Sequence, residues 1–336
     1  MRRVANLFEQ ILEPENIRLA FYKASRGKKS HESVRLFARD LDQRVKSISD
    51  AIRNDSFPLG RFHQFLIRDP KERVITAPCF DERVLHHAIM NLCEPVLDQW
   101  LIDDTFACRV GKGRERAVTR ASYFAHKHSW YLKLDVRKFF DSVRHETLVT
   151  LLEKRFKDRR LLQLLNRIIH AYRENIGLGI PIGSLTSQHF ANFYLGWFDR
   201  FVKETLRVKG YIRYMDDMIL WHNDLHELQS IQRRCIDFAS DDLGLEFKPS
   251  DVRRTSTGVG FLGCRIWPTH VELNRRSKRR WYCRLRVLER AERLGLISEV
   301  ELQIRTTALT AFATSGGVKS WRFRQSVLQK NSVDDP

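Results

Sequence analysis

Two adjacent aspartates lie between two apolar stretches of this chain, and this arrangement restricts the fold more than any other feature. Residues 211–215, YIRYM, and 218–221, MILW, have the composition of buried β-strands, and Asp216 and Asp217 lie in the short turn between them. Burying two ionised carboxylates side by side is costly unless a cation neutralises them. The pattern therefore predicts a β-hairpin that presents two acids to a bound cation.

A third aspartate supports the same interpretation. Asp135 lies in the apolar stretch LKLDV at residues 132–136, which has the composition of another buried strand. Three carboxylates and a backbone carbonyl suit two octahedral Mg²⁺ ions, which keep water and phosphate oxygens as their remaining ligands. Two such ions, about 4 Å apart, can activate an attacking 3′-hydroxyl and stabilise a leaving pyrophosphate. Asp135, Asp216 and Asp217 are therefore candidate catalytic residues for nucleotidyl transfer.

The charge of the chain favours a nucleic-acid partner. Its 336 residues include 59 Lys and Arg against 41 Asp and Glu, which gives a net charge of +18 and a pI near 9.9. Such an excess is typical of proteins that bind polyanions. No apolar run reaches the length of a membrane span, and acids lie where a signal peptide needs an uncharged core, so we expect a cytoplasmic protein with no membrane partner.

Hydrophobic periodicity predicts an α+β fold in which a small antiparallel sheet is backed by helices. Residues 1–56 have the pattern of a helix, a basic turn and a second helix, and residues 61–78 that of a β-hairpin with basic residues at its tip. Further helices are expected over residues 81–102, 146–173, 184–206 and 225–242. Strands near 245–255 and 259–267 are expected to lead into a basic helical tail.

The segment LDVRKFFDS, read together with YMDD, resembles the palm motifs of reverse transcriptases. The resemblance extends over residues 61 to about 280. It implies a right-hand polymerase fold with an N-terminal helical extension, fingers, a palm that holds a helical insertion, and a helical thumb. The expected ranges are 1–60 for the extension, 61–132 for the fingers, 133–265 for the palm with its insertion at about 146–180, and 266–336 for the thumb. It also implies that Asp135, Asp216 and Asp217 bind the two Mg²⁺ ions, for which Mn²⁺ can substitute, with the Val136 carbonyl assisting.

The same resemblance implies a nucleotide pocket. Lys71 and Arg73, in the segment DPKERVI, match the basic fingertip that reverse transcriptases fold over the incoming triphosphate. Phe140 matches the aromatic residue that lies beside the sugar C2′, where it excludes a 2′-hydroxyl and favours dNTPs. Strand alternation would then make Phe139 the core residue of the pair.

The segment 179–188, GIPIGSLTSQ, resembles the loop-to-helix motif beneath the templating base pair, but it departs from the usual reverse transcriptase pattern. Ile182-Gly183 replaces Gln-Gly, and Gln188 replaces the proline of Ser-Pro. Isoleucine cannot donate the glutamine's hydrogen bond, and the loss of such a bond costs about 1 kcal/mol, or roughly fivefold in selectivity. Together with residues 107–113 and 261–270, the segment looks like the reverse transcriptases of diversity-generating retroelements. That likeness implies error-prone copying of a template-repeat RNA, with mutations at adenines, and a basic, pentameric accessory variability determinant protein.

Basic residues dominate the segment 275–286, RRSKRRWYCRLR, in which Trp281 and Tyr282 are interleaved. On a helix these residues form a surface that binds phosphates and stacks a base or sugar, as expected of a thumb that holds the template–primer duplex. The candidate nucleic-acid contacts are Arg275, Arg276, Lys278, Arg279, Arg280 and Trp281.

Two alternatives to mutagenic copying in a bacterial or phage-encoded retroelement remain open. One keeps the chemistry and places the chain among phage-defence, retron or group II intron reverse transcriptases. The other is a non-catalytic RNA-binding scaffold, which would be expected to lack the carboxylates that this chain retains.

Overall fold

Two interleaved groups of residues form the fold in the computed structural model, which describes residues 3–68, 72–172 and 176–314. Unit 1 comprises Met1–Ile102, Val136–Phe201 and Arg234–Lys248. Unit 2 comprises Asp103–Asp135, Val202–Arg233 and Pro249–Pro336. The mixture of many helices with small antiparallel sheets confirms the predicted fold class. The division into fingers, palm and thumb stays a prediction.

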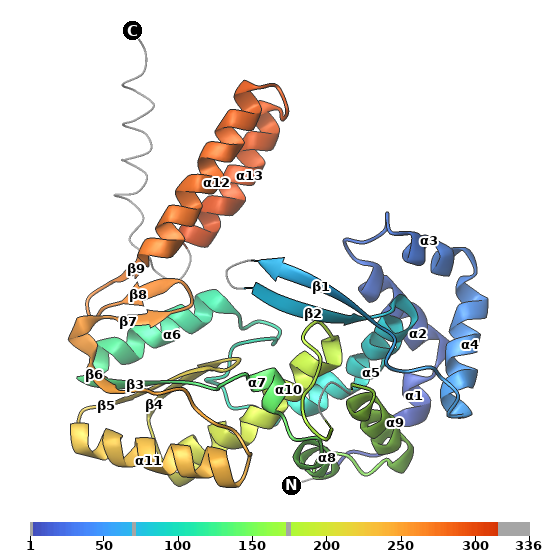
Figure 1. Cartoon of the computed structure of the whole chain (residues 1–336), viewed down its shortest axis with the longest axis horizontal. Coiled ribbons are helices and arrows are strands. Elements are labelled where there is room, and N and C mark those ends of the chain that lie inside the picture. The colour runs from blue at the N-terminus through green and yellow to red at the C-terminus, as the bar shows by residue number, and fades with distance from the viewer. Residues whose placement is uncertain (1–2, 69–71, 173–175, 315–336) are drawn as a thin grey trace. The chain divides into compact units, whose positions relative to one another are not determined.

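Unit 1 is mainly helical (Figure 1). Its helices are α1 (Phe8–Ile11), α2 (Pro14–Ser25), α3 (Glu32–Arg39), α4 (Leu41–Arg53), α5 (Phe80–Asp98), α7 (Phe139–Ser142), α8 (His145–Glu153), α9 (Arg159–His170) and α10 (Leu185–Arg200). Helix α5 is central, because it contacts α2 and α10. Its residues Val84, Leu85, Ala88 and Ile89 are fully buried at helical spacing, which explains why this segment folds as the core helix.

A two-stranded antiparallel hairpin, β1 (Phe62–Arg68) and β2 (Glu72–Pro78), projects from these helices. Glu82, which is buried on α5, holds the entry to the hairpin by accepting hydrogen bonds from the backbone of Gly60 at 3.0 Å and of Arg61 at 3.3 Å. Since an isolated hairpin is only marginally stable in water, such anchoring fixes where the hairpin begins.

The helix expected over residues 146–173 is interrupted, which corrects the prediction. Helix α8 ends at Glu153, and α9 begins at Arg159. The Oδ1 atom of Asp158 caps α9 by accepting a hydrogen bond from the backbone of Leu161 at 3.2 Å. A good N-cap within a continuous apolar pattern favours a new helix start, and the periodicity of the flanking turns conceals it.

Unit 2 contains a four-stranded antiparallel sheet in the order β4-β5-β3-β6, formed by β3 (Trp130–Asp135), β4 (Gly210–Tyr214), β5 (Asp217–His222) and β6 (Val252–Arg254). Helix α6 (Arg114–Lys127) packs on one face of this sheet (Figure 1). Phe124 of α6 joins Ile212, Ile219 and Trp221 in the buried cluster. A π-helix (Phe201–Thr205) precedes β4, and α11 (Leu225–Asp241) contributes residues to both units.

A second, three-stranded antiparallel sheet of unit 2 is formed by β7 (Val259–Phe261), β8 (Cys264–Ile266) and β9 (Val271–Leu273), after a 3₁₀ turn at Thr255–Thr257. The single strand expected over 259–267 is thus a hairpin. Leu262 and Gly263 have φ angles of 47° and 81°, the left-handed values that a two-residue turn between antiparallel strands requires. The apolar run in the sequence conceals this turn.

Helices α12 (Arg275–Arg293) and α13 (Glu299–Thr314) lie side by side in unit 2 (Figure 1). They correspond to the predicted basic helical tail. None of the helices in the described ranges is both long and apolar enough to cross a membrane.

Candidate active site

The two adjacent aspartates lie where the sequence predicts, at the head of a hairpin in unit 2. Tyr214 of β4 pairs with Asp217 of β5, so Met215 and Asp216 form the turn. Met215 has a φ of 53°, and its carbonyl accepts a hydrogen bond from the buried guanidinium of Arg213 at 3.1 Å. This bond and the short loop fix the position of the acidic turn on the sheet.

Asp135, the last residue of β3, lies directly opposite Asp217, the first residue of β5. In antiparallel strands, directly opposed side chains share a face, and their Cβ atoms lie about 5 Å apart. Tyr214 lies opposite Asp217 on the other side, so its side chain belongs to this face as well. Two of the three predicted catalytic carboxylates are therefore neighbours on one face of the sheet, with the third in the adjoining turn.

Lys133 is a cation in direct contact with one of these acids. It lies two residues before Asp135 on β3 and therefore on the same face. Its Nζ donates hydrogen bonds to Oδ2 of Asp217 at 3.0 Å and to the carbonyl of Gly260 at 2.8 Å. The pKa of Asp217 is raised to about 6: burial raises it most, the nearby Asp135 and Asp216 add to the rise, and Lys133 opposes it.

The other carboxylate oxygen of Asp217, Oδ1, is buried and accepts no hydrogen bond in the described structure. A buried oxygen of this kind is costly unless a donor or a cation completes it. Hard carboxylate oxygens are the ligands that Mg²⁺ prefers, so the residues present fit a divalent ion chemically. Across the described residues, however, no three His, Cys, Asp or Glu side chains are grouped so that they could hold a metal ion. The metal-ligand assignment therefore stays a prediction.

Unit 1 brings together Phe140, Ile182 and Gly183, three of the residues predicted to form the nucleotide pocket. The loop before α10 pairs with two other segments through its backbone. Ile180 donates to the carbonyl of Phe140 at 2.9 Å, and the carbonyl of Ile182 accepts from the backbone of Thr76 on β2 at 2.7 Å. Phe140, the loop and the strand that begins next to Arg73 are thus neighbours in one unit.

Gly183 is fitted closely against β2. Its φ is +123°, and a Cβ atom there would lie 2.6 Å from Cγ2 of Ile75 and 3.2 Å from the carbonyl of Thr76. A glycine is therefore required by both the backbone conformation and the close approach.

A buried polar network supports the same loop from beneath. Nδ1 of His86 on α5 lies 3.0 Å from the hydroxyl of Ser184, which in turn lies 2.9 Å from the hydroxyl of Thr186. All three side chains are buried. Burial lowers the pKa of His86 to about 3, with a smaller effect of His87 in the same direction, so the ring is neutral at neutral pH.

The remaining pocket residues have different surroundings. Arg73 is exposed on β2, and Gln188 is exposed in the first turn of α10. Lys71 lies outside the described residues. Phe139 is buried and Phe140 is half-buried, as predicted, but both lie on the short helix α7, with their rings in a T-shaped contact, so strand alternation is not the cause of the difference. Val136 is buried and forms an antiparallel bridge with Phe247.

The structure corrects one member of the predicted nucleic-acid surface. Trp281 is only 5% exposed and belongs to the buried cluster of unit 2, so its ring is not available to stack on a base. Tyr282, which is 41% exposed, is the aromatic residue of this helix that remains accessible. The basic residues Arg275, Arg276 and Arg279 are exposed on α12, and Lys278 and Arg280 are half-buried.

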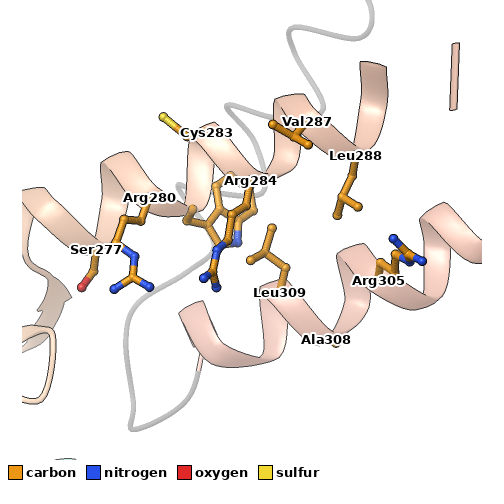
Figure 2. Close-up of a pocket in the computed structure, with 10 residues that line it drawn as sticks. Ser277, Arg280, Cys283, Arg284, Val287, Leu288, Arg305, Ala308 and Leu309 are labelled. Atoms are coloured by element: carbon orange, nitrogen blue, oxygen red, sulfur yellow. The ribbon is translucent and has the colours of Figure 1, made fainter. Parts of the chain in front are cut away.

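A pocket of about 710 Å³ lies between α12 and α13. Figure 2 shows Arg280 and Arg284 projecting from α12, and Leu309 and Arg305 from α13. Its apolar floor and basic rim extend the candidate surface from α12 onto α13.

Sequence reasoning missed Lys133 and the His86–Ser184 network. The alternation of strand residues could have revealed Lys133, because positions 133 and 135 of one strand must share a face. No comparable signal identifies His86, since its partner Ser184 is distant in the chain and buried histidines have no characteristic spacing.

Comparisons with known proteins identify the family to which this chain is similar. A protein-family model described as "Reverse transcriptase (RNA-dependent DNA polymerase)" matches residues 67–266. The group II intron-encoded protein LtrA of Lactococcus lactis subsp. cremoris is 23% identical over 203 residues, which cover 57% of this chain and 34% of that protein. Nuclear intron maturase 4, mitochondrial, of Arabidopsis thaliana is 25% identical over 206 residues, which cover 59% of this chain and 25% of that protein. The chain thus spans about a third or less of the length of these relatives.

Solved structures resemble the fold. A telomerase from Candida tropicalis in complex with a fragment of telomeric RNA has a TM-score of 0.51 at 11% identity, and the match covers 83% of this chain and 59% of that one. Apo telomerase from the same organism has a TM-score of 0.50 at 12% identity, with 64% and 49% covered. The fold is that of a right-hand polymerase.

Proposed function

Because this chain belongs to the reverse transcriptase family, we propose that it is an RNA-templated DNA polymerase that copies a template-repeat RNA into error-prone cDNA for a diversity-generating retroelement. The observation that carries the finer assignment is Ile182, which stands in the family motif where most reverse transcriptases have glutamine. Its backbone carbonyl is fixed to β2, so the position is held in place while its side chain lacks a polar group. In this proposal the chain keeps all three catalytic carboxylates but discriminates weakly between correct and incorrect base pairs.

In this proposal the acids of unit 2 carry the chemistry. Asp135, Asp216 and Asp217 would hold two Mg²⁺ ions with the Val136 carbonyl, and the ions would lower the pKa of the 3′-hydroxyl and stabilise the charge of the leaving pyrophosphate. Asp217 would bind through Oδ1, which accepts no hydrogen bond from the described residues. Lys133 holds the second oxygen of Asp217 and limits the repulsion between the neighbouring carboxylates.

The residues of unit 1 would select the nucleotide. Lys71 and Arg73 bind the triphosphate of the dNTP through charge-assisted hydrogen bonds. Phe140 excludes a 2′-hydroxyl by contact with the sugar. Ile182, Gly183 and Gln188 form the surface beneath the templating pair. Arg275, Arg276, Lys278, Arg279 and Arg280 bind the phosphates of the template RNA and the cDNA or primer strand.

Replacing Ile182 by glutamine tests the assignment. We expect Ile182→Gln to reduce misincorporation opposite template adenines by roughly fivefold, because a restored hydrogen bond contributes about 1 kcal/mol to discrimination. Sequencing of cDNA made from a defined RNA template measures this. Leu178→Gln, which places the same side chain at an exposed position of the same loop, is the matched control. An unchanged adenine error rate in Ile182→Gln would remove the basis for the mutagenic role.

The proposed partners include a basic, pentameric accessory variability determinant protein. Its contact would be formed by the helical extension, residues 1–60, or by the thumb. Co-purification of the chain with the product of a small neighbouring gene tests this.

A second candidate function is supported by the intron-encoded relatives, which suggest an intron or other retroelement role without mutagenesis. The DNA that flanks the gene separates the two. A near-duplicate of the 3′ end of a downstream gene that differs at adenines supports diversification, whereas flanking intron RNA or a retron RNA gene supports the second candidate.

A further inference from the structure

A strongly basic pocket lies in unit 1, formed by elements to which the proposed polymerase chemistry assigns no role. Its volume is about 760 Å³. Four basic residues, Arg3, Arg155, Lys157 and Arg200, line it together with Trp100. The described residues that line it include no carboxylate, so the charge of the pocket is not balanced by its own walls.

Arg155 is the central feature of this pocket. It lies in the segment that connects α8 and α9 and is only 6% exposed. One guanidinium nitrogen donates to the carbonyl of Val96 at 2.8 Å, but Nε is buried and has no acceptor among the described residues. Burial lowers the pKa of Arg155, and the neighbouring Arg200 lowers it further. A buried cation beside another cation is thus left partly without hydrogen bonds.

The backbone of the N-terminal segment holds one wall of the pocket. Val4 forms a parallel bridge with Phe156, in which Val4 donates to the carbonyl of Arg155 at 2.8 Å and accepts from Lys157 at 2.7 Å. Arg3 donates to the carbonyl of Phe156 through two guanidinium nitrogens, at 3.3 and 3.2 Å. Arg3, Arg155 and Lys157 on this wall therefore belong to backbone segments whose positions are fixed by hydrogen bonds.

The opposite wall is formed where α5 and α10 end. The guanidinium of Arg200 lies over the ring of Trp100, 3.8 Å from its centroid, and its Nε donates to the Trp100 carbonyl at 3.0 Å. The indole Nε1 of Trp100 is buried without an acceptor in the described structure. Both unsatisfied groups of the lining, Nε of Arg155 and Nε1 of Trp100, are donors.

Leaving a buried guanidinium without a counter-charge is strongly unfavourable, and an anion in the pocket would remove this cost. We propose that this pocket is a binding site for a phosphate group, provided either by an RNA strand or by a free phosphate ion. A phosphate group offers several acceptor oxygens, which complement the basic side chains and the two unsatisfied donors of the lining, and the planar guanidinium fork suits its geometry. The proposal does not depend on which retroelement the enzyme serves.

Two pocket variants of the full-length protein test the site. Arg155→Met removes the buried charge and keeps an unbranched side chain. Lys157→Met changes an exposed position and is not expected to affect folding. Arg39→Met removes an arginine that is 74% exposed on α3 and serves as the matched control. The probes are inorganic phosphate, compared with chloride at equal ionic strength, and a short single-stranded RNA.

For the wild type we expect phosphate to raise the Tm in a saturable manner and chloride not to do so. In Arg155→Met this rise is abolished, whereas the Tm in phosphate-free buffer is not lowered, because the variant no longer buries an uncompensated charge. If RNA supplies the phosphate, Arg155→Met weakens RNA binding about tenfold. The slope of log K against log salt then falls by about 0.7 for each phosphate that the variant no longer binds.

The outcomes separate the two sources. A loss of RNA affinity in both pocket variants assigns the site to the strand, and a loss of the phosphate effect alone assigns it to the free ion. The proposal is overturned if phosphate stabilises the wild type no more than chloride does and both pocket variants bind RNA like Arg39→Met. A phosphate effect that persists in both pocket variants also overturns it, since the anion then binds elsewhere.

Discussion

Lys133 donates a hydrogen bond from its Nζ to Oδ2 of Asp217 over 3.0 Å, so an ammonium group lies on one of the carboxylates that is proposed to bind metal. The same Nζ donates to the carbonyl of Gly260, which links the four-stranded sheet to β7. A divalent ion bound to Asp217 would therefore compete with Lys133 for the charge of this carboxylate, and the competition can be measured.

The carboxylates of the hairpin are expected to be essential for catalysis. Asp216→Asn and Asp217→Asn should each lower the rate of dNTP incorporation on an RNA template by on the order of a thousandfold, because bound metal ions stabilise the transition-state charge by several kcal/mol. Primer extension in Mg²⁺ measures this. Asp224→Asn is the control, since Asp224 precedes α11 and accepts a hydrogen bond from the backbone of Glu227, and asparagine caps a helix equally well. Retained incorporation in both hairpin variants would contradict the metal assignment.

Removing Lys133 should strengthen metal binding at pH 8 and make it more sensitive to acidification. At pH 8 we expect Lys133→Met to bind Mn²⁺ about fivefold more tightly, because a competing, partly exposed ion pair is removed. The ammonium also lowers the pKa of Asp217, which is about 6, so the variant carboxyl takes up a proton at a higher pH and its affinity falls more steeply on acidification. Calorimetric titration with Mn²⁺ at pH 8 and pH 6 compares the affinities of the wild type and the variant. Equal affinities of wild type and variant at both values would show that Lys133 does not compete with the ion.

Gly183 should not tolerate a side chain. A Cβ atom there would approach Ile75 to 2.6 Å in a backbone conformation that favours glycine, so Gly183→Ala should cost about 1–3 kcal/mol and raise the KM for dNTPs. Gly177→Ala is the matched control, because Gly177 lies in the same loop with a φ of +72° and has open space around its Cβ position. Both glycines have a positive φ, but only Gly183 lacks room for a Cβ atom. Comparing the two alanine variants by thermal unfolding and steady-state extension therefore separates the effect of the steric clash from that of backbone strain. The explanation fails if the two alanine variants behave alike.

The two neighbouring phenylalanines should have separable roles. Phe140→Ala is expected to weaken the preference for dNTPs over NTPs by about tenfold, because the sugar C2′ then faces open space. Phe139→Ala should cost about 3–5 kcal/mol of stability, since its ring is buried, without changing that preference. Parallel extension assays with each nucleotide class measure the preference, and a loss of selectivity in Phe139→Ala alone would reverse the assignment.

The buried His86 should contribute to acid sensitivity. Its pKa is about 3 in the folded protein and 6.5 as the ordinary value, so between these values the unfolded chain binds more protons than the folded one. The free energy of unfolding therefore falls as the pH drops below 6.5, by up to about 1.4 kcal/mol per pH unit for this group. His86→Asn, which can keep the acceptor for Ser184 but does not titrate, should lack this part of the loss. Urea unfolding at pH 7 and pH 5 gives the difference, and the exposed His63→Asn is the control.

The sequence predicted the fold where the signals are local. The apolar strands around Asp216, the helix that became α5 and the basic α12 all follow from period and composition. Prediction from the sequence failed where contacts between segments distant in the chain determine the structure. Asp158, whose Oδ2 accepts hydrogen bonds from the backbone of Leu7 and Phe8, caps a new helix within an apolar pattern that looks continuous. Trp281 is buried in the core of unit 2 although basic residues surround it in sequence.

The candidate site likewise has a part that could be predicted from local sequence and a part that could not. The carboxylates could be placed from strand composition and their turn. The pairing of Lys133 with Asp217 depends on the register of two strands, and that of His86 with Ser184 on packing between two helices. Local periodicity determines neither the strand register nor the helix packing, so these residue pairs could be identified only from the structure.

The hairpin β1–β2 has one more consequence, which concerns how the protein behaves in solution. It forms a two-stranded sheet, and its described residues include the exposed side chains of Phe65, Leu66, Ile67 and Val74. Among the described residues β1 pairs only with β2, so it presents its outer edge next to apolar surface, the combination that promotes strand addition between molecules. Arg73, directly opposite Ile67, places a charge on this ribbon. Besides its proposed contact with triphosphate, this arginine would act as a gatekeeper against aggregation, and its removal should reduce soluble yield as well as activity.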